Sequence, residues 1–245
     1  GGCPWLPRIG FVIITNRRDV EKMPDQLARS AGLAIAARDD EELKNFVVGL
    51  DLAGDEDVGE LKNIAKSLEK AFAHCLPITI HAGEGEEEAL AEKIWQAAYH
   101  LNADRIGHGL TLDKEPDLAA RFRNRNICLE LCPTSNLEVV GFYDPLPGSL
   151  GYAGKKRYPL KKLWEMGLPL TLCTDNPGIS KTTLAEEYLT ASRLVDGLTL
   201  WDVLAMVKQA FSHSFLTADE REKLMKKADK IIYQLVAGEF GNIAR

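Results

Sequence analysis

The sequence lacks several features that would assign it to a specialised class of protein. Its five cysteines are odd in number and irregular in spacing, which argues against a disulfide framework and favours reduced thiols in the cytoplasm. No apolar run approaches the roughly 20 residues of a membrane span, and no signal peptide opens the chain. The net charge of −6 disfavours a surface for nucleic acid or for an anionic membrane. We therefore expect a cytoplasmic protein, with small neutral or cationic ligands left open.

A regular alternation of strand-like and helix-like segments runs along the chain. Apolar strands that are separated by helices are typical of a parallel sheet covered on its faces. No G-x-G-x-x-G turn follows any of these strands, which weakens the case for a nucleotide cofactor. The six predicted strands are Ile9–Thr15, Asn45–Gly54, Pro77–Gly83, Asp104–Gly109, Asn126–Pro133 and Leu168–Asn176.

The helices and the strand count together indicate a (β/α) barrel of the TIM type or a doubly wound sheet. Helical patterns cover residues 60–75 and 86–101, and residues 182–243 are predicted to be helical throughout. A complete eight-unit barrel takes about 250 residues, whereas this chain of 245 residues contains six units and a helical tail. We predict one domain over residues 1–245, an α/β barrel with six of eight strands and C-terminal helices. The long stretch Gly141–Pro159 is predicted to be a functional or flexible loop.

Polar side chains recur where the predicted strands end. In parallel α/β folds, the carboxyl ends of the strands carry the functional site. Histidine and aspartate converging there suggest a zinc site with an open position for water. Glu84, three residues after one of the histidines, is suited to act beside the metal as a proton donor or acceptor. The residues at the strand ends are Asp51, His81, His108, Glu130 and Asp175.

Each of these residues also has an ordinary structural explanation. A single histidine after a strand is more often a hydrogen-bonded loop residue than a ligand. The sequence from Asp175 to Gly178, D-N-P-G, is common turn chemistry. Asp51 and Glu130 could be structural carboxylates that pair with Arg105 or a lysine. It is their coincidence on matching strand ends that favours a functional site.

Several motifs, taken in order, resemble those of the adenosine deaminase family of zinc-dependent aminohydrolases. The resemblance covers essentially the whole chain. It implies hydrolytic deamination of adenosine, or of a related 6-aminopurine, to the 6-oxo product and ammonia. The motifs are GLDLAGDE (Gly49–Glu56), HAGE (His81–Glu84), RIGHG (Arg105–Gly109), LCPTSN (Leu131–Asn136), TDNPGISKTTL (Thr174–Leu184) and SHSFLTADEREKL (Ser212–Leu224).

The resemblance also implies catalytic roles for individual residues. His81 and Asp175 would be ligands of Zn²⁺, and Asp175 would also hold the attacking water. Glu84 would protonate N1 of the purine. His108 would orient and deprotonate the water and would stabilise the charge that develops during attack.

Substrate contacts and two departures complete the comparison with the family. By resemblance, the backbone of Gly54 would contact N3 of the purine, and Asn176 would contact N7. The family commonly has two consecutive aspartates where this chain has Asp175 and Asn176, so the substrate could differ. The family's His-x-His motif, which supplies two further zinc ligands, does not occur in this sequence.

The missing motif leads us to expect the C-terminal portion of a longer enzyme, which would lack two metal ligands when alone. We also expect a retained N-terminal fragment, or self-association across exposed strand edges. Two alternatives stay open: a deaminase for adenine, an adenosine nucleotide or a conjugate, and a non-catalytic binding protein of the same fold. Lys155, Lys156 and Arg157 could contact an anion, although such a cluster is more often a solvated patch.

Overall fold

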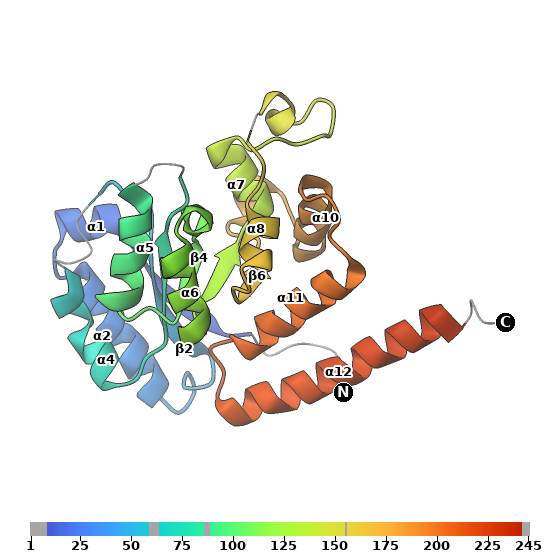
Figure 1. Ribbon diagram of the computed structural model, residues 1–245. Coiled ribbons are helices and arrows are strands. Elements are labelled where there is room, and N and C mark those ends of the chain that lie inside the picture. Colours follow the sequence, from blue (N-terminus) through green and yellow to red (C-terminus); the bar gives the residue numbers. More distant parts are fainter. Residues whose placement is uncertain (1–8, 59–63, 86–88, 155, 242–245) are drawn as a thin grey trace. The chain divides into compact units, whose positions relative to one another are not determined.

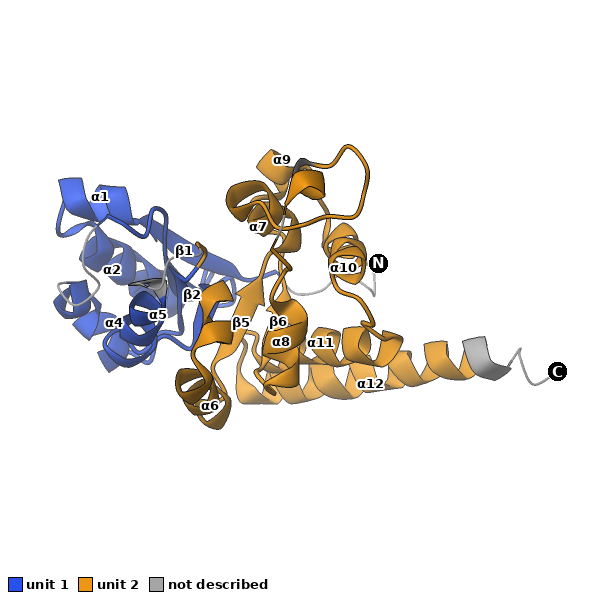
Figure 2. Cartoon of the chain, turned by 45° about the horizontal axis from the view of Figure 1, so that its top comes forward, with its two compact units in different colours: residues 1–83, 88–107 blue, residues 84–87, 108–245 orange. Residues whose placement is uncertain are grey.

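The chain forms two compact units, shown in Figure 2. A computed structural model describes residues 9–58, 64–85, 89–154 and 156–241. Unit 1 comprises residues 1–83 and 88–107, and unit 2 comprises residues 84–87 and 108–245. The assignment of residues 1–245 to one domain stays a prediction.

Unit 1 is built on strands that lie in chain order (Figure 1). Strands β1, β2 and β3 pair in parallel, and the residues of β2 are almost all buried. Burial on both faces explains the continuous apolar character of β2 in the sequence. The strands are β1 (Phe11–Asn16), β2 (Val47–Ala53), β3 (Ile78–Ala82) and β4 (Arg105–His108), the last of which ends at the boundary between the units.

Helices pack against the sheet of unit 1. Helix α2 contacts β1 and β2 through a side that is rich in alanine. Ala31 and Ala34 are fully buried there, and their small side chains let the helix approach the sheet closely. The helical segments of unit 1 are α1 (Arg17–Lys22), α2 (Gln26–Asp39), η1 (Ala65–Leu68), α4 (Glu69–Ala73) and α5 (Ala89–Tyr99).

Unit 2 combines two parallel strands with most of the helices. β5 (Cys128–Leu131) pairs with β6 (Leu170–Leu172), and Leu129 lies beside Leu170 with both side chains fully buried. The helical segments of unit 2 are η2 (Leu110–Lys114), α6 (Pro116–Arg125), α7 (Pro133–Val140), η3 (Leu150–Ala153), α8 (Leu160–Glu165), α9 (Pro177–Ser180), α10 (Leu184–Leu194), α11 (Leu200–Ser212) and α12 (Ala218–Gly241).

The predicted strands are confirmed, since the described residues contain six strands and each lies within or overlaps a predicted one. The helices at 60–75 and 86–101 are confirmed in their described parts, while residues 60–63 and 86–88 lie outside the described ranges. In the described part of the chain, no helix is both long and apolar enough to span a membrane.

The prediction of continuous helix over residues 182–243 is wrong. The described part of this segment is interrupted between α10 and α11 and again between α11 and α12. Gly197 lies in the first interruption at a φ of +78°, a left-handed conformation that glycine adopts at no steric cost. Thr199 then starts α11 with a capping box, in which its hydroxyl accepts from the Asp202 amide and the Asp202 carboxylate accepts from the Thr199 amide. The sequence pattern T-x-x-D signals this break.

The long loop Gly141–Pro159 is tied to the rest of unit 2 by a buried carboxylate. Asp144 is fully buried, and both of its oxygens accept hydrogen bonds from Arg193 of α10, at 2.8 and 3.0 Å. Asp144 also accepts from the amide of Leu146 within the loop. The loop is therefore anchored near its start by a contact with a residue 49 positions further along the chain.

Candidate active site

His108 stands at the end of β4 in a conformation that few residues other than glycine adopt. Its φ is +65°, and that of Gly109 is +66°. A Cβ on Gly109 would lie 2.8 Å from Cδ2 of Leu129, so a side chain at this position would meet both strain and a clash. Left-handed backbone at a non-glycine residue costs about 1–3 kcal/mol and is frequent at functional sites. The turn places a strained histidine, only 2% exposed, at the strand end.

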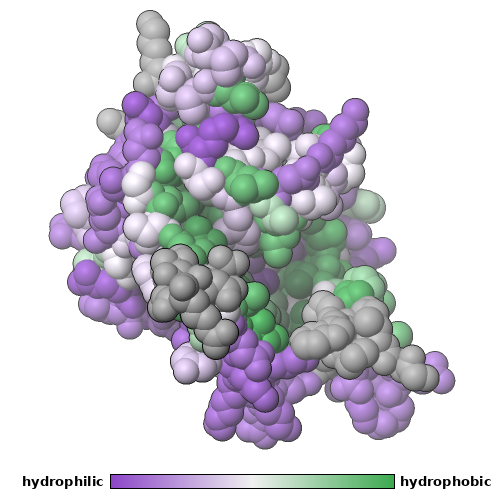
Figure 3. Space-filling model, turned by 90° about the vertical axis from the view of Figure 1, so that its right-hand side faces the viewer, coloured by the Kyte–Doolittle hydropathy of each residue, from purple (hydrophilic) through white to green (hydrophobic). Residues whose placement is uncertain are grey.

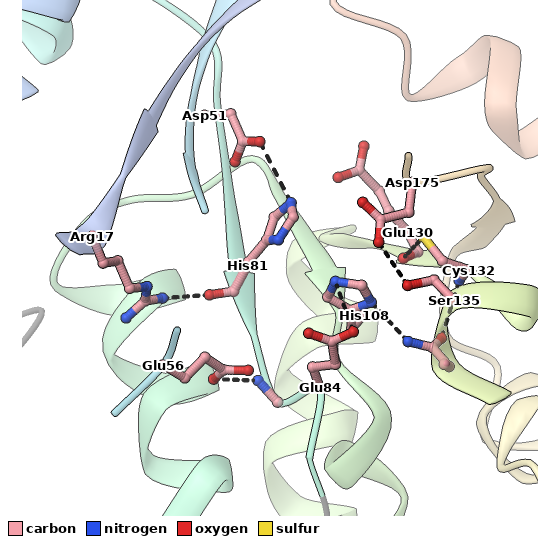
Figure 4. Close-up of polar contacts among 12 residues, drawn as sticks. Arg17, Asp51, Glu56, His81, Glu84, His108, Glu130, Cys132, Ser135 and Asp175 are labelled. Carbon is pink, nitrogen blue, oxygen red and sulfur yellow. Dashed lines mark hydrogen bonds and ion pairs between the residues drawn. The ribbon is translucent and has the colours of Figure 1, made fainter. Parts of the chain in front are cut away.

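Both ring nitrogens of His108 face polar groups of unit 2 (Figure 4). Nδ1 lies 2.9 Å from Nδ2 of Asn136 in α7. Nε2 lies 3.8 Å from Oε1 of Glu84, at the distance of an ion pair if the ring is protonated. Glu84 is half-buried. The histidine is thus oriented from one side by an amide and faces a carboxylate on the other.

Asp175 follows β6 and also has a left-handed backbone, with a φ of +52°. One of its oxygens, Oδ2, accepts a 2.7 Å hydrogen bond from the hydroxyl of Ser135. Ser135 is buried in the first turn of α7 and directly precedes Asn136. Two consecutive residues of one helix therefore hold Asp175 and His108.

Glu84, His108 and Asp175 form a cluster that could bind a metal ion. Each offers one ligand atom, and these atoms all lie within 4.8 Å of one another. Carboxylate oxygen and imidazole nitrogen are donors that zinc accepts, so the cluster fits such an ion. The sequence predicts Asp175 as a ligand and the other two residues as catalytic, and the structure brings all three together.

His81, the other predicted ligand, belongs to unit 1, where it contacts Asp51 and Arg17 (Figure 4) and lies against Gly107. Its Nε2 lies 3.5 Å from Oδ2 of Asp51, and its carbonyl oxygen accepts from Arg17. Its ring lies against Gly107, where a Cβ would come within 2.7 Å of Cδ2 of the ring. Metal-ligating histidines are commonly oriented by a carboxylate in this way. Joint ligation by His81 and Asp175 stays a prediction.

The two predicted substrate contacts have well-defined backbones. Gly54 has a φ of +94°, a conformation that favours glycine, and a Cβ there would lie 2.8 Å from the side-chain amide of Asn16. The side-chain oxygen of Asn176 accepts from the amide of Ile179 and caps the short helix α9, so this segment is a helix start and not only a turn. The cap occupies the oxygen, and the NH₂ group is the part suited to donate to N7 of a purine. Recognition of N3 by Gly54 and of N7 by Asn176 stays a prediction.

Burial keeps two further groups beside the cluster in their neutral forms. Burial, followed by the nearby Cys173 and Asp175, raises the pKa of the Cys132 thiol well above its ordinary value. Burial likewise raises the pKa of Tyr158 well above 10. Glu130, predicted at this edge, lies in β5 and is half-buried, and its carbonyl oxygen faces the Cys132 thiol at 3.6 Å. A neutral thiol is a weak nucleophile, so covalent catalysis by Cys132 is disfavoured.

Three residues that orient the site carry no role in the sequence-based prediction. Ser135 and Asn136 lie in the LCPTSN motif, where polar residues directly after a strand are the local signal that points to them. Tyr158 lies in the long loop, and its hydroxyl reaches Asn136 at 3.0 Å. No local pattern identifies Tyr158, because its contact spans 22 residues of sequence.

Comparison with known proteins identifies the family of the chain. The family model of adenosine deaminase matches residues 12–231. An adenosine deaminase from Clostridium acetobutylicum is 31% identical over 75% of this chain and 51% of the relative. The chain spans about half the length of the curated relatives it matches.

Two solved structures resemble the chain in fold. A zinc-bound cog1816 amidohydrolase from Burkhoderia ambifaria superposes with a TM-score of 0.74 at 23% identity, over 93% of this chain and 59% of that one. An N6-methyl-AMP deaminase from Arabidopsis thaliana gives a TM-score of 0.68 at 26% identity, over 90% of this chain and 58% of that one. The fold is that of the amidohydrolase barrels, as the sequence predicts. Because the family model matches residues 12–231, which is most of the chain, the chain belongs to the adenosine deaminase family.

Proposed function

We propose that this chain carries the reaction centre of a hydrolytic deaminase that removes the 6-amino group of adenosine, or of a related 6-aminopurine, as ammonia. The observation that carries the proposal is the convergence of Glu84, His108 and Asp175 within 4.8 Å. Two of these residues have left-handed backbones, which a fold retains only where the surrounding structure enforces them. The family to which the chain belongs supplies the reaction class.

The chemistry that these residues supply follows from their types and positions. Half-buried Glu84 would hold a proton for N1 of the purine, so that the ring can accept electrons as C6 is attacked. His108 would contact the oxygen that adds to C6, and Asp175 would hold the attacking water. A zinc ion bound here would supply hydroxide near neutral pH by lowering the pKa of its water to about 7.

Ammonia release and zinc content test this proposal together. We expect the chain, once completed by a segment that supplies the two further ligands, to bind zinc and to release ammonia from adenosine. In the same protein we expect Glu84→Gln to abolish ammonia release while zinc content is retained. Loss of zinc from the variant would assign Glu84 as a ligand instead of a proton donor. Zinc binding with no ammonia from adenosine, adenine or AMP would favour the non-catalytic alternative.

A second candidate, a 6-aminopurine nucleotide as substrate, is favoured by a cationic cavity in unit 2. The cavity has a volume of about 260 Å³, and its lining includes Gly85, which follows Glu84, and Leu110, two residues after His108. Lys114, Lys156 and Arg157 line it together with one acid, Asp113, so its wall has an excess of positive charge. Lys155, predicted beside them, lies outside the described residues. The similarity to an N6-methyl-AMP deaminase supports the same substrate class.

Calorimetric binding of AMP and adenosine separates the two substrates. We expect AMP to bind more tightly than adenosine. The double variant Lys156→Ala with Arg157→Ala should weaken the affinity for AMP by roughly tenfold and leave the affinity for adenosine unchanged, because only AMP carries the phosphate. Lys226→Ala on α12 is the control, since Lys226 pairs with Glu222 and does not line the cavity. Equal loss for both ligands would contradict a phosphate contact.

A further inference from the structure

Asn136 is held in one orientation by two donors in unit 2. The backbone amide of Cys132 donates to its Oδ1 at 3.2 Å, and the hydroxyl of Tyr158 donates to the same oxygen at 3.0 Å. A backbone N–H can only donate, so the group that faces Cys132 must be the oxygen. The reverse orientation would place the NH₂ group against this N–H in a site where Asn136 is fully buried.

The orientation of Asn136 determines which ring nitrogen of neutral His108 carries the proton. The NH₂ group of Asn136 lies 2.9 Å from Nδ1 of His108, and an amide NH₂ has no lone pair to offer, so Nδ1 must accept. A neutral imidazole that accepts at one nitrogen carries its proton on the other. We propose that Asn136 is a positioning residue that holds His108 as the Nε2–H tautomer, which makes His108 a hydrogen-bond donor toward the reacting atoms and not a general base. The catalytic meaning of this inference rests on the proposed function.

Tyr158 keeps the arrangement in place. The hydroxyl stays protonated, because burial raises the pKa of Tyr158 well above its ordinary value, and it therefore remains a donor to Asn136. The ring is itself fixed by an edge contact with Phe142 at 5.2 Å between centroids. The chain of contacts from Tyr158 through Asn136 to His108 is buried along its whole length.

The tautomer redistributes the proton transfers of the reaction. With Nε2 protonated, His108 would donate to the oxygen that bonds to C6, and within the cluster only the carboxylates of Glu84 and Asp175 would be available to a metal ion. The proton of the attacking water would then pass to the carboxylate of Asp175, whose Oδ2 is already oriented by Ser135. This differs from the role that the family resemblance implies for His108, which is to deprotonate the water.

Water, Glu84 and Asp175 account for every proton that is transferred in the reaction. Addition breaks one O–H bond of water and forms the O–C6 bond, while N1 receives a proton from Glu84. Collapse passes the proton on Asp175 to the amino nitrogen, and ammonia leaves with the electrons of the C6–N bond. The remaining hydroxyl proton at C6 returns to Glu84 as the C6=O bond forms.

Nuclear magnetic resonance of the histidine rings tests the inference on the chain itself. Two-bond ¹⁵N–¹H spectra of the metal-free chain at about pH 8, above the usual imidazole pKa of about 6.5, report which nitrogen carries the proton. We expect Nε2–H for His108, with the signal assigned by its loss in His108→Gln. His74 is an internal control of the opposite tautomer, because its Nδ1 atom faces a carbonyl oxygen at 2.8 Å.

Two variants show that Asn136 is the cause. Asn136→Asp replaces the donor with an acceptor and should move the proton of His108 to Nδ1, whereas Tyr158→Phe should retain Nε2–H because the Cys132 amide still orients Asn136. Nδ1–H in the wild-type chain, or an unchanged tautomer in Asn136→Asp, would overturn the inference. The wild-type spectrum decides even if Asn136→Asp fails to fold. Because no turnover is measured, failure here leaves the proposed function standing, and the reverse also holds.

Discussion

At the scale of single residues, glycines at or beside strand ends let neighbouring side chains approach the backbone closely. Because Gly107 has no Cβ, the ring of His81 packs directly against its backbone, and the side chain of Asn16 lies close to Gly54 for the same reason. Gly109 extends the left-handed turn that His108 begins. A glycine in a strand often marks such a close approach, and these three lie at or beside strand ends.

Replacement of Gly107 by alanine should displace His81. The new Cβ would lie 2.7 Å from the ring, so the ring or the strand must move, and overpacking of this kind costs about 1–3 kcal/mol of unfolding free energy. We expect a lower denaturation midpoint and a shifted His81 ring signal in the spectra described above. An unchanged signal would show that the ring does not lie against Gly107.

Gly32→Ala is the matched control in unit 1. Gly32 lies within α2, and a Cβ there would meet nothing within 4 Å. Alanine in a helix interior should raise the unfolding free energy by about 0.5–1 kcal/mol. The same substitution should therefore have opposite signs at positions 107 and 32, as chemical denaturation would measure.

At the scale of elements, helices α7 and α10 organise the site of unit 2. Helix α7 supplies Ser135 and Asn136 from consecutive positions. Helix α10 supplies Glu187, fully buried, which accepts from the amide of Thr134 at 2.9 Å and from the hydroxyl of Thr182 at 2.7 Å. Arg193 of α10 also anchors the long loop through Asp144. The two helices and the loop are thus joined by buried polar contacts.

Asp144→Asn should destabilise unit 2 in a pH-dependent manner. Burial tends to raise the pKa of Asp144, but hydrogen bonds from Arg193 and Leu146 outweigh it, and the pKa is lowered on balance. A lowered folded-state pKa contributes stability above the unfolded value of about 3.9, and this stability is lost as pH falls through the folded value. At pH 7 the variant should lose about 3 kcal/mol, because Arg193 loses its charged partner.

Chemical denaturation across pH measures this effect. The difference between wild type and Asp144→Asn should be constant near neutral pH and should shrink as pH falls below about 4. Asp196→Asn serves as the control, because Asp196 is 89% exposed and its pair with Arg157 is 3.5 Å long. Exposed pairs contribute about 0–1 kcal/mol. A similar loss for both variants would contradict a buried ion pair at Asp144.

At the scale of the whole molecule, apolar side chains remain at the surface of both units. Figure 3 shows hydrophobic residues on one face of the molecule. In unit 1 the exposed set includes Phe11 and Ile14 of β1, and in unit 2 it includes Leu189 of α10 and Trp201 of α11. An exposed apolar strand is a site for pairing with another chain, so such surfaces favour association.

Ile14→Lys should reduce self-association of the chain. Ile14 is 62% exposed on β1, the outer strand of unit 1, and a charge on an exposed edge strand discourages pairing. Sedimentation velocity over a range of concentrations should show larger species for the wild type than for the variant. Leu33→Lys on α2 is the control, with an exposure of 60% but no strand edge. An equal effect of both changes would indicate general stickiness instead of strand pairing.

The sequence by itself determined the six strands, the residues at their ends and the family, because apolar runs and polar strand ends are local patterns. Only the tertiary structure decided which side chains meet. The contact of Asn136 with His108 joins residues 28 positions apart, and that of Ser135 with Asp175 joins residues 40 apart. The helix breaks near Gly197 and Thr199 carry local signals, but the apolar period of the helices outweighed them in the prediction. Spacing along the chain indicates which residues lie in the same strand. The hydrogen-bond partners of a side chain depend on how strands and helices that are distant in sequence pack together.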